Sequence, residues 1–128
     1  VMTHILLIED DLDDQEIFLS ALTGIPGLIA CETVDGGSVA LAGLRSGEIA
    51  PDIIFLDLKM EGINGFEFMN QVRISPTLRK IPIIIITDSA DPLDIEMSKI
   101  AGAKRFITKP EDALELEKAI KESVQTFS

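Results

Sequence analysis

The chain has 128 residues, with 11 Lys and Arg against 22 Asp and Glu and a formal net charge of −11. This length predicts one domain, which we expect to span residues 1–128 without room for a separate output module. Because acids outnumber bases two to one, direct binding of nucleic acid is disfavoured. The apolar runs are far shorter than the roughly 20 residues of a membrane span. We therefore expect a cytoplasmic protein that does not bind membranes and is a monomer or weak homodimer.

Five short apolar runs predict β-strands. Continuous Ile, Leu and Val without alternation is typical of parallel strands that helices cover on both faces. The runs lie at residues 5–8, 28–31, 53–56, 83–86 and 106–107.

Amphipathic helix patterns follow each of these runs. Asp13, with Glu16 three residues later, predicts a capping box at the first helix, and Pro92 suits the first turn of the fourth. The alternation predicts an α/β fold with a five-stranded, doubly wound parallel sheet. The helices are expected at about residues 13–22, 38–46, 66–73, 92–100 and 113–127.

Reactive side chains follow four of the five predicted strands. In a doubly wound sheet the functional crevice lies beyond the carboxyl ends of the strands, so these side chains are expected to converge. They are Glu9, Asp10 and Asp11 after the first strand, Asp57 after the third, Thr87, Asp88 and Ser89 after the fourth, and Lys109 after the fifth.

The converging carboxylates predict a cation. Two like charges about 4 Å apart repel by roughly 4 kcal/mol at an effective dielectric constant near 20. Hard oxygen ligands without Cys or His favour Mg²⁺ (or Mn²⁺) and disfavour zinc.

A metal, an isolated aspartate, a hydroxyl and a lysine form a constellation suited to phosphoryl transfer. Asp57 would be the nucleophile and form an acyl phosphate, while Lys109 and Thr87 would contact phosphoryl oxygens. Taken singly, each residue has a simpler interpretation, since Asp57 or Asp11 could cap a helix.

The chain resembles a receiver domain of the two-component response regulators, of the stand-alone type, over essentially its whole length. The stretches that match are ILLIEDD at 5–11, IIFLDLKMEGING at 53–65, IIIIT at 83–87 and FITKP at 106–110. The resemblance implies a flavodoxin-like (βα)5 fold with strand order 2-1-3-4-5.

The resemblance also implies a role for individual residues. Asp57 matches the phosphoacceptor and a metal ligand, and Asp10 matches the more direct acidic ligand. Glu9 would reach the metal through water, and the backbone carbonyl of Lys59 would complete the protein ligands. Lys109 matches the lysine that contacts the phosphoryl group.

A conformational switch is implied by the same resemblance. Thr87 and Phe106 match the two switch positions, and the bond before Pro110 is expected to be cis. A histidine kinase or a histidine phosphotransfer protein would donate the phosphoryl group. The output would be a protein contact with an unknown target through the fourth helix, fifth strand and fifth helix, and the chain would catalyse only its own phosphorylation and dephosphorylation.

Several positions depart from the common receiver pattern, among them Phe106, which lacks the hydroxyl of the frequent tyrosine. Glu61 replaces a frequent proline, and Asp88 follows Thr87 where a small residue is usual. We expect Lys59 and Asp88 to modulate the lifetime of the acyl phosphate through an ion pair over Asp57.

Other interpretations stay open. Asp88 and Glu61 are compatible with a degenerate receiver that is never phosphorylated and acts as a protein-binding module. A haloacid-dehalogenase-like phosphatase needs a second acid where this chain has Lys59. A dinucleotide-binding fold needs a glycine-rich loop where this chain has Glu9, Asp10 and Asp11.

Overall fold

The computed structural model describes residues 2–128. Its parallel strands form one sheet in the order β2-β1-β3-β4-β5, which confirms the predicted fold class and strand order. The strands are β1 (Thr3–Ile8), β2 (Ile29–Val34), β3 (Ile53–Leu56), β4 (Ile83–Thr87) and β5 (Arg105–Thr108).

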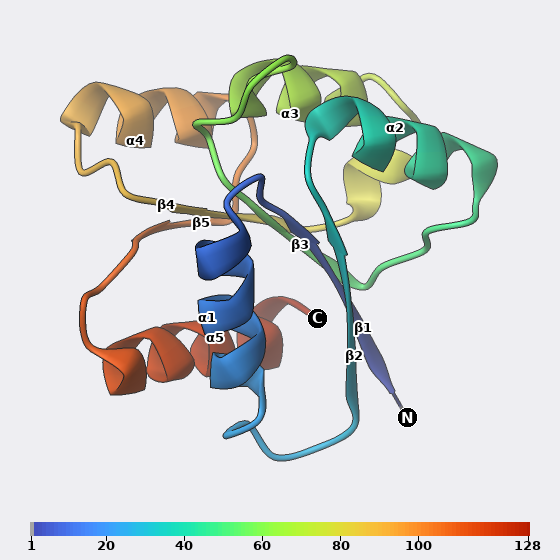
Figure 1. Cartoon of the computed structure of the whole chain (residues 1–128). Coiled ribbons are helices and arrows are strands. Elements are labelled where there is room, and N and C mark those ends of the chain that lie inside the picture. Colours follow the sequence, from blue (N-terminus) through green and yellow to red (C-terminus); the bar gives the residue numbers. More distant parts are fainter. Residues whose placement is uncertain (1) are drawn as a thin grey trace.

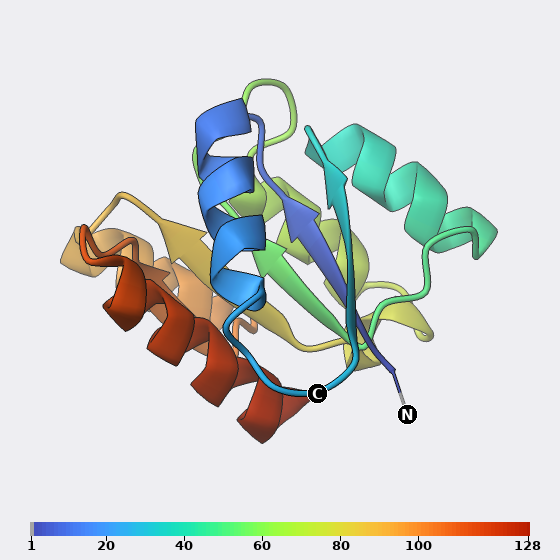
Figure 2. The ribbon, with the colours of Figure 1, turned by 60° about the horizontal axis from the view of Figure 1, so that its bottom comes forward.

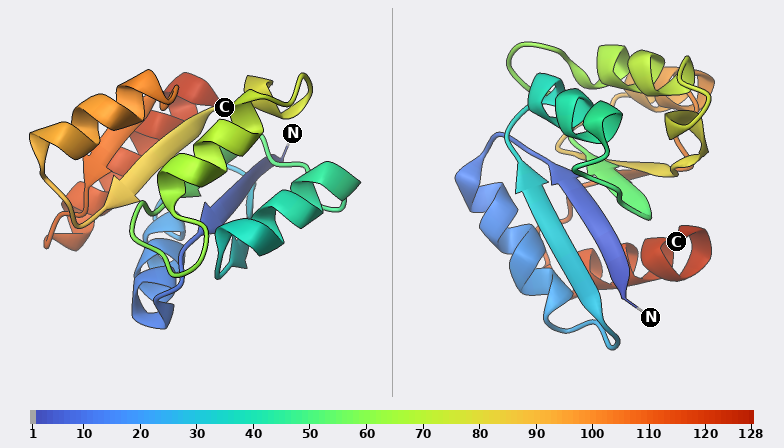
Figure 3. Two further views of the ribbon diagram at one scale, coloured as in Figure 1. Left: turned by 90° about the horizontal axis from the view of Figure 1, so that it is seen from above. Right: turned by 90° about the vertical axis from the view of Figure 1, so that its right-hand side faces the viewer.

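Helices cover both faces of this sheet. Figure 1 shows α2, α3 and α4 on one face and α1 and α5 on the other. Figure 2 shows α1 and α5 side by side, and the left view in Figure 3 shows α2, α3 and α4 in a row. The helices are α1 (Leu12–Leu22), α2 (Gly37–Ser46), α3 (Gly65–Arg73), α4 (Pro92–Ile100) and α5 (Ala113–Phe127), with a short 3-10 helix η1 (Leu78–Lys80) before β4.

The alternation of side chains along each strand creates a core on each face. In β1, Leu6 and Ile8 pack with the residues of α2 and α3, whereas Ile5 and Leu7 pack with those of α1 and α5. The residues of β3 are fully buried, as continuous apolarity predicts for a central parallel strand.

The second strand differs from its prediction. It begins at Ile29 and continues to Val34 instead of covering 28–31, and Leu28 is 63% exposed. It lies at the edge of the sheet (Figure 3, right), so it is only partly covered and carries polar residues that the search for continuous apolar runs passed over.

The start of the first helix also differs from its prediction. The helix begins at Leu12, and its N-cap is Asp11, whose Oδ1 accepts a hydrogen bond from the Asp14 N–H at 3.0 Å. The predicted capping box of Asp13 and Glu16 is therefore wrong, because an earlier acid already has the extended backbone of an N-cap. The fourth helix covers Pro92–Ile100 as predicted.

No helix within residues 2–128 combines the length and apolarity needed to cross a lipid bilayer.

Candidate functional site

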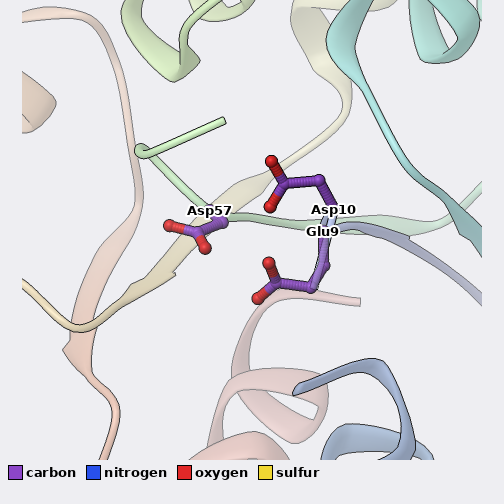
Figure 4. Close-up of side chains that lie close together, drawn as sticks. All are labelled: Glu9, Asp10 and Asp57. Carbon is purple, nitrogen blue, oxygen red and sulfur yellow. The ribbon is translucent and has the colours of Figure 1, made fainter. Parts of the chain in front are cut away.

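The predicted acidic residues meet at the carboxyl ends of β1 and β3. One carboxylate oxygen from each of Glu9, Asp10 and Asp57 lies within 4.8 Å of the others, and Figure 4 shows the three side chains close together. Glu9 and Asp57 are buried, whereas Asp10 is exposed. The Asp57 N–H donates to the Ile8 carbonyl at 3.1 Å, which holds the two strand ends in register.

Lys109 reaches this cluster from the end of β5. Its Nζ lies 2.6 Å from Glu9 Oε1, 2.8 Å from Asp14 Oδ2 and 3.3 Å from Asp57 Oδ2. Its backbone N–H donates to the Thr87 carbonyl at 2.7 Å, so β4 holds the start of this loop. One ammonium group therefore faces three carboxylates.

Burial and charge change the ionisation of two groups in the site. Burial raises the pKa of Glu9 to about 7, and the hydrogen bond from Lys109 only partly opposes that rise. Burial alone would lower the pKa of Lys109, but hydrogen bonds to Asp14 and Glu9 and the charge of Asp57 raise that pKa above its usual value.

The loop after β3 places backbone amides against the acidic cluster. The Lys59 N–H donates to Asp57 Oδ1 at 3.0 Å, and the Glu61 N–H donates to Asp10 Oδ2 at 3.3 Å. The proline that is frequent in receivers at the position of Glu61 has no N–H, so it could not donate the hydrogen bond to Asp10. Gly65 packs so closely that a Cβ there would lie 2.8 Å from Leu58 Cα, which helps to define the loop.

The two predicted switch residues lie in neighbouring strands. Thr87 is buried at the end of β4, and its Oγ1 has no hydrogen-bond partner within the described chain. Phe106 is partly buried in β5 and packs against the core on the α2, α3 and α4 face.

The expected ion pair between Lys59 and Asp88 is wrong, because the ion pairs within residues 2–128 do not include it. Asp88 instead lines a small cavity together with Lys109 and Phe18.

The prediction of a cis peptide bond before Pro110 is also wrong, because no cis peptide bond occurs among residues 2–128. Trans is the lower-energy form of an X-Pro bond by about 0.5–1 kcal/mol.

Asp14 is the site residue that the sequence analysis missed. It belongs to the first turn of α1, where an acid is common because it interacts favourably with the helix N-terminus. The available signal was its place three residues after the cap Asp11, in a helix that starts directly beyond β1.

The donor set fits a divalent metal ion. Three carboxylates converge from two strand ends, and a hard cation with oxygen ligands would offset their mutual repulsion. The acidic cluster can therefore bind a divalent metal.

Comparison with known proteins agrees with this geometry. Residues 5–121 match the model of the response regulator receiver domain. The chain is 33% identical over 116 residues to the protein PilH of Pseudomonas aeruginosa, covering 90% of this chain and 93% of PilH. It is 32% identical to the transcriptional regulatory protein CseB of Streptomyces coelicolor, covering 98% of this chain but only 50% of CseB.

Solved structures show the same similarity. The phosphorylated cyanobacterial phytochrome response regulator RcpA superimposes with a TM-score of 0.90 at 27% identity, covering 99% of this chain and 94% of RcpA. The chemotaxis response regulator CheY4 of Vibrio cholerae gives a TM-score of 0.80 at 25% identity, covering 95% of this chain and 98% of CheY4. The chain belongs to the response regulator receiver domain family, whose members act in two-component signalling.

Proposed function

We propose that this receiver domain takes a phosphoryl group onto Asp57 in a reaction that depends on Mg²⁺ (or Mn²⁺). Receiver domains of response regulators interact with histidine kinases or phosphotransfer proteins, and we propose a phosphohistidine on such a protein as the donor. The observation that carries the proposal is the convergence of Glu9, Asp10, Asp57 and Lys109 at one edge of the sheet.

The proposed reaction is a single displacement at phosphorus. A carboxylate oxygen of Asp57 forms the new P–O bond, and the P–N bond to the imidazole breaks, leaving a neutral donor histidine after proton transfer. A bound divalent ion would supply positive charge that neutralises the transferring phosphoryl oxygens. Asp10, Asp57, the backbone carbonyl of Lys59 and, through water, Glu9 would hold the ion.

The other residues of the site suit the phosphorylated form. Lys109 already lies 3.3 Å from Asp57 and can donate to a phosphoryl oxygen. The unpartnered Thr87 hydroxyl would gain an acceptor when the phosphoryl group arrives, and a buried hydroxyl without a partner costs about 1–3 kcal/mol. This gain would draw Thr87 toward Asp57 and favour an inward position of Phe106.

The α4 helix supports an output through protein contact. Three apolar side chains at helical spacing remain exposed on it, with exposed fractions of 63%, 41% and 68% for Leu93, Met97 and Ile100. We propose that an unidentified target protein contacts this helix together with β5 and α5, in line with the sequence prediction.

No observation specifically favours the alternative functions. The clustered acids, the nearby lysine and the buried hydroxyl support the receiver proposal, and Lys59 occupies the position where a dehalogenase-like phosphatase needs an acid. We propose that the chain catalyses only its own phosphorylation and dephosphorylation. Its location in the cytoplasm, its single-domain organisation and its oligomeric state stay predictions.

Phosphorylation by a small donor tests the proposal. Wild-type protein incubated with acetyl phosphate and Mg²⁺ should gain the mass of one phosphoryl group, and Asp57→Asn should gain none. Asp35→Asn removes an exposed acid outside the site and should be modified like wild type. If neither acetyl phosphate nor a phosphorylated histidine kinase modifies the wild type, the degenerate receiver replaces this proposal.

A further inference from the structure

The position of Lys109 is set by more than the acids that match the receiver pattern. Its Nζ lies 2.8 Å from Asp14 Oδ2 and 2.6 Å from Glu9 Oε1, but 3.3 Å from Asp57 Oδ2. The ammonium therefore lies closer to the carboxylates of Glu9 and Asp14 than to that of Asp57.

The surroundings strengthen the contact with Asp14. The side chain of Lys109 is 14% exposed and that of Asp14 is 29% exposed. A cavity of about 160 Å³ lies beside them, with Phe18, Ile86 and Leu116 among the residues that line it. Because both side chains are largely buried, a charge-assisted hydrogen bond here is stronger than one on an open surface.

We propose that Asp14 is a positioning residue that holds Lys109 back from Asp57 until a phosphoryl group arrives. The inference rests on the proposed function, since it concerns the same phosphorylation. An acyl phosphate adds about one negative charge and strong acceptor oxygens at Asp57. These oxygens compete with Asp14 for the ammonium, so the carboxylate of Asp14 opposes phosphorylation and favours the unmodified form.

Asp13 provides a control that distinguishes the contact of Asp14 with Lys109 from a general effect of negative charge. Both acids lie in the first turn of α1, so both interact with the helix N-terminus and both add to the local negative potential. Asp13 is exposed and forms no ion pair within residues 2–128. The N–H of Asp14 that bonds Asp11 belongs to the backbone, so an Asn side chain leaves the cap in place.

The test compares Asp14→Asn with Asp13→Asn. With acetyl phosphate at a fixed Mg²⁺ concentration, Asp14→Asn should be phosphorylated roughly three to ten times faster than wild type, since one charge-assisted hydrogen bond no longer restrains the ammonium. Asp13→Asn should stay within about twofold of wild type, because the distant charge is partly screened.

A double-mutant cycle tests whether Asp14 affects the phosphorylation rate through Lys109. In a Lys109→Met background, adding Asp14→Asn should change the phosphorylation rate no more than adding Asp13→Asn does. In wild type, NMR of ¹⁵N-labelled lysine should show a slowly exchanging Lys109 ammonium, and Asp14→Asn should accelerate that exchange.

Three results are decisive. Equal rates for Asp14→Asn and Asp13→Asn would overturn the role of Asp14. A full effect of Asp14→Asn in the Lys109→Met background would also overturn it, because the effect would not pass through the lysine. Failure of the wild type to be modified at Asp57 would instead overturn the proposed function.

Discussion

The backbone N–H of Glu61 donates to Asp10 Oδ2 across 3.3 Å, which ties the loop after β3 to the loop after β1. Asp10 is exposed, and it takes part in no ion pair among residues 2–128. Its charge is therefore offset by a backbone amide alone, next to the carboxylates of Glu9 and Asp57.

This arrangement predicts that Asp10→Asn stabilises the metal-free protein. Removing the charge of one of these three clustered acids relieves repulsion and should raise the melting temperature by roughly 2–5 °C. The same variant should lose most of the stabilisation that Mg²⁺ gives to wild type, because one of the proposed metal ligands is gone. Thermal unfolding with and without Mg²⁺ measures both effects, and Asp35→Asn, which removes an acid outside the cluster, is the control. A lower melting temperature for metal-free Asp10→Asn would contradict the prediction.

The raised pKa of Glu9 predicts that Mg²⁺ affinity depends on pH. Burial moves this pKa from 4.5 to about 7, so a proton must leave before the carboxylate can help to bind the ion. The apparent affinity should rise with pH until about 7, by at most about tenfold per pH unit. Calorimetric titrations at several pH values measure it, and Glu9→Gln should give a flatter profile. An equally steep profile in that variant would assign the pH dependence to another group.

The raised pKa of Glu9 also makes the stability of the fold depend on pH. The folded chain retains a proton on Glu9 between pH 4.5 and about 7, where the unfolded chain has lost it. The contribution of Glu9 to the free energy of unfolding therefore decreases as pH rises through that range.

The central strands and the site acids were predictable because burial and position in the fold determine them. The residues of β3 are continuously apolar since helices cover both faces of the strand, and Asp57 follows at the edge where parallel strands end. The edge strand β2 was misplaced because its partly exposed residues lack that pattern.

Contacts between loops could not be predicted in the same way. The contact of Asp14 with Lys109 joins residues 95 positions apart, and it depends on the angle at which α1 leaves the sheet. Whether Lys59 and Asp88 form an ion pair likewise depends on the directions that two side chains take in loops beyond their strands, and the structure forms no such pair within residues 2–128. Neither property is encoded in local spacing.

Gly65 predicts a steric requirement next to Asp57. A Cβ at this position would lie 2.8 Å from Leu58 Cα and 3.2 Å from the Asp57 carbonyl oxygen, so the loop backbone would have to shift. Gly65→Ala should lower the free energy of unfolding by about 1–3 kcal/mol and slow the phosphorylation of Asp57. Gly36→Ala is a matched control, because nothing lies within 4 Å of a Cβ there. Urea denaturation and the acetyl phosphate assay measure the two effects; similar values for both variants would show that the close approach is easily relieved.

Thr87→Val is predicted to separate stability from signalling. The Thr87 hydroxyl is buried without a partner in the described residues, so a methyl group of similar size should raise the free energy of unfolding of the unmodified protein by about 1 kcal/mol. The variant should still be phosphorylated, but the changes in amide chemical shift that phosphorylation produces in α4 and β5 should be much smaller. Thr108→Val is the contrasting control, because the Thr108 hydroxyl donates to the Ser89 carbonyl at 2.8 Å and its loss should destabilise the protein. If Thr87→Val is destabilised as much as Thr108→Val, the Thr87 hydroxyl already has a partner in solution, and the gain of a phosphoryl acceptor cannot drive the switch.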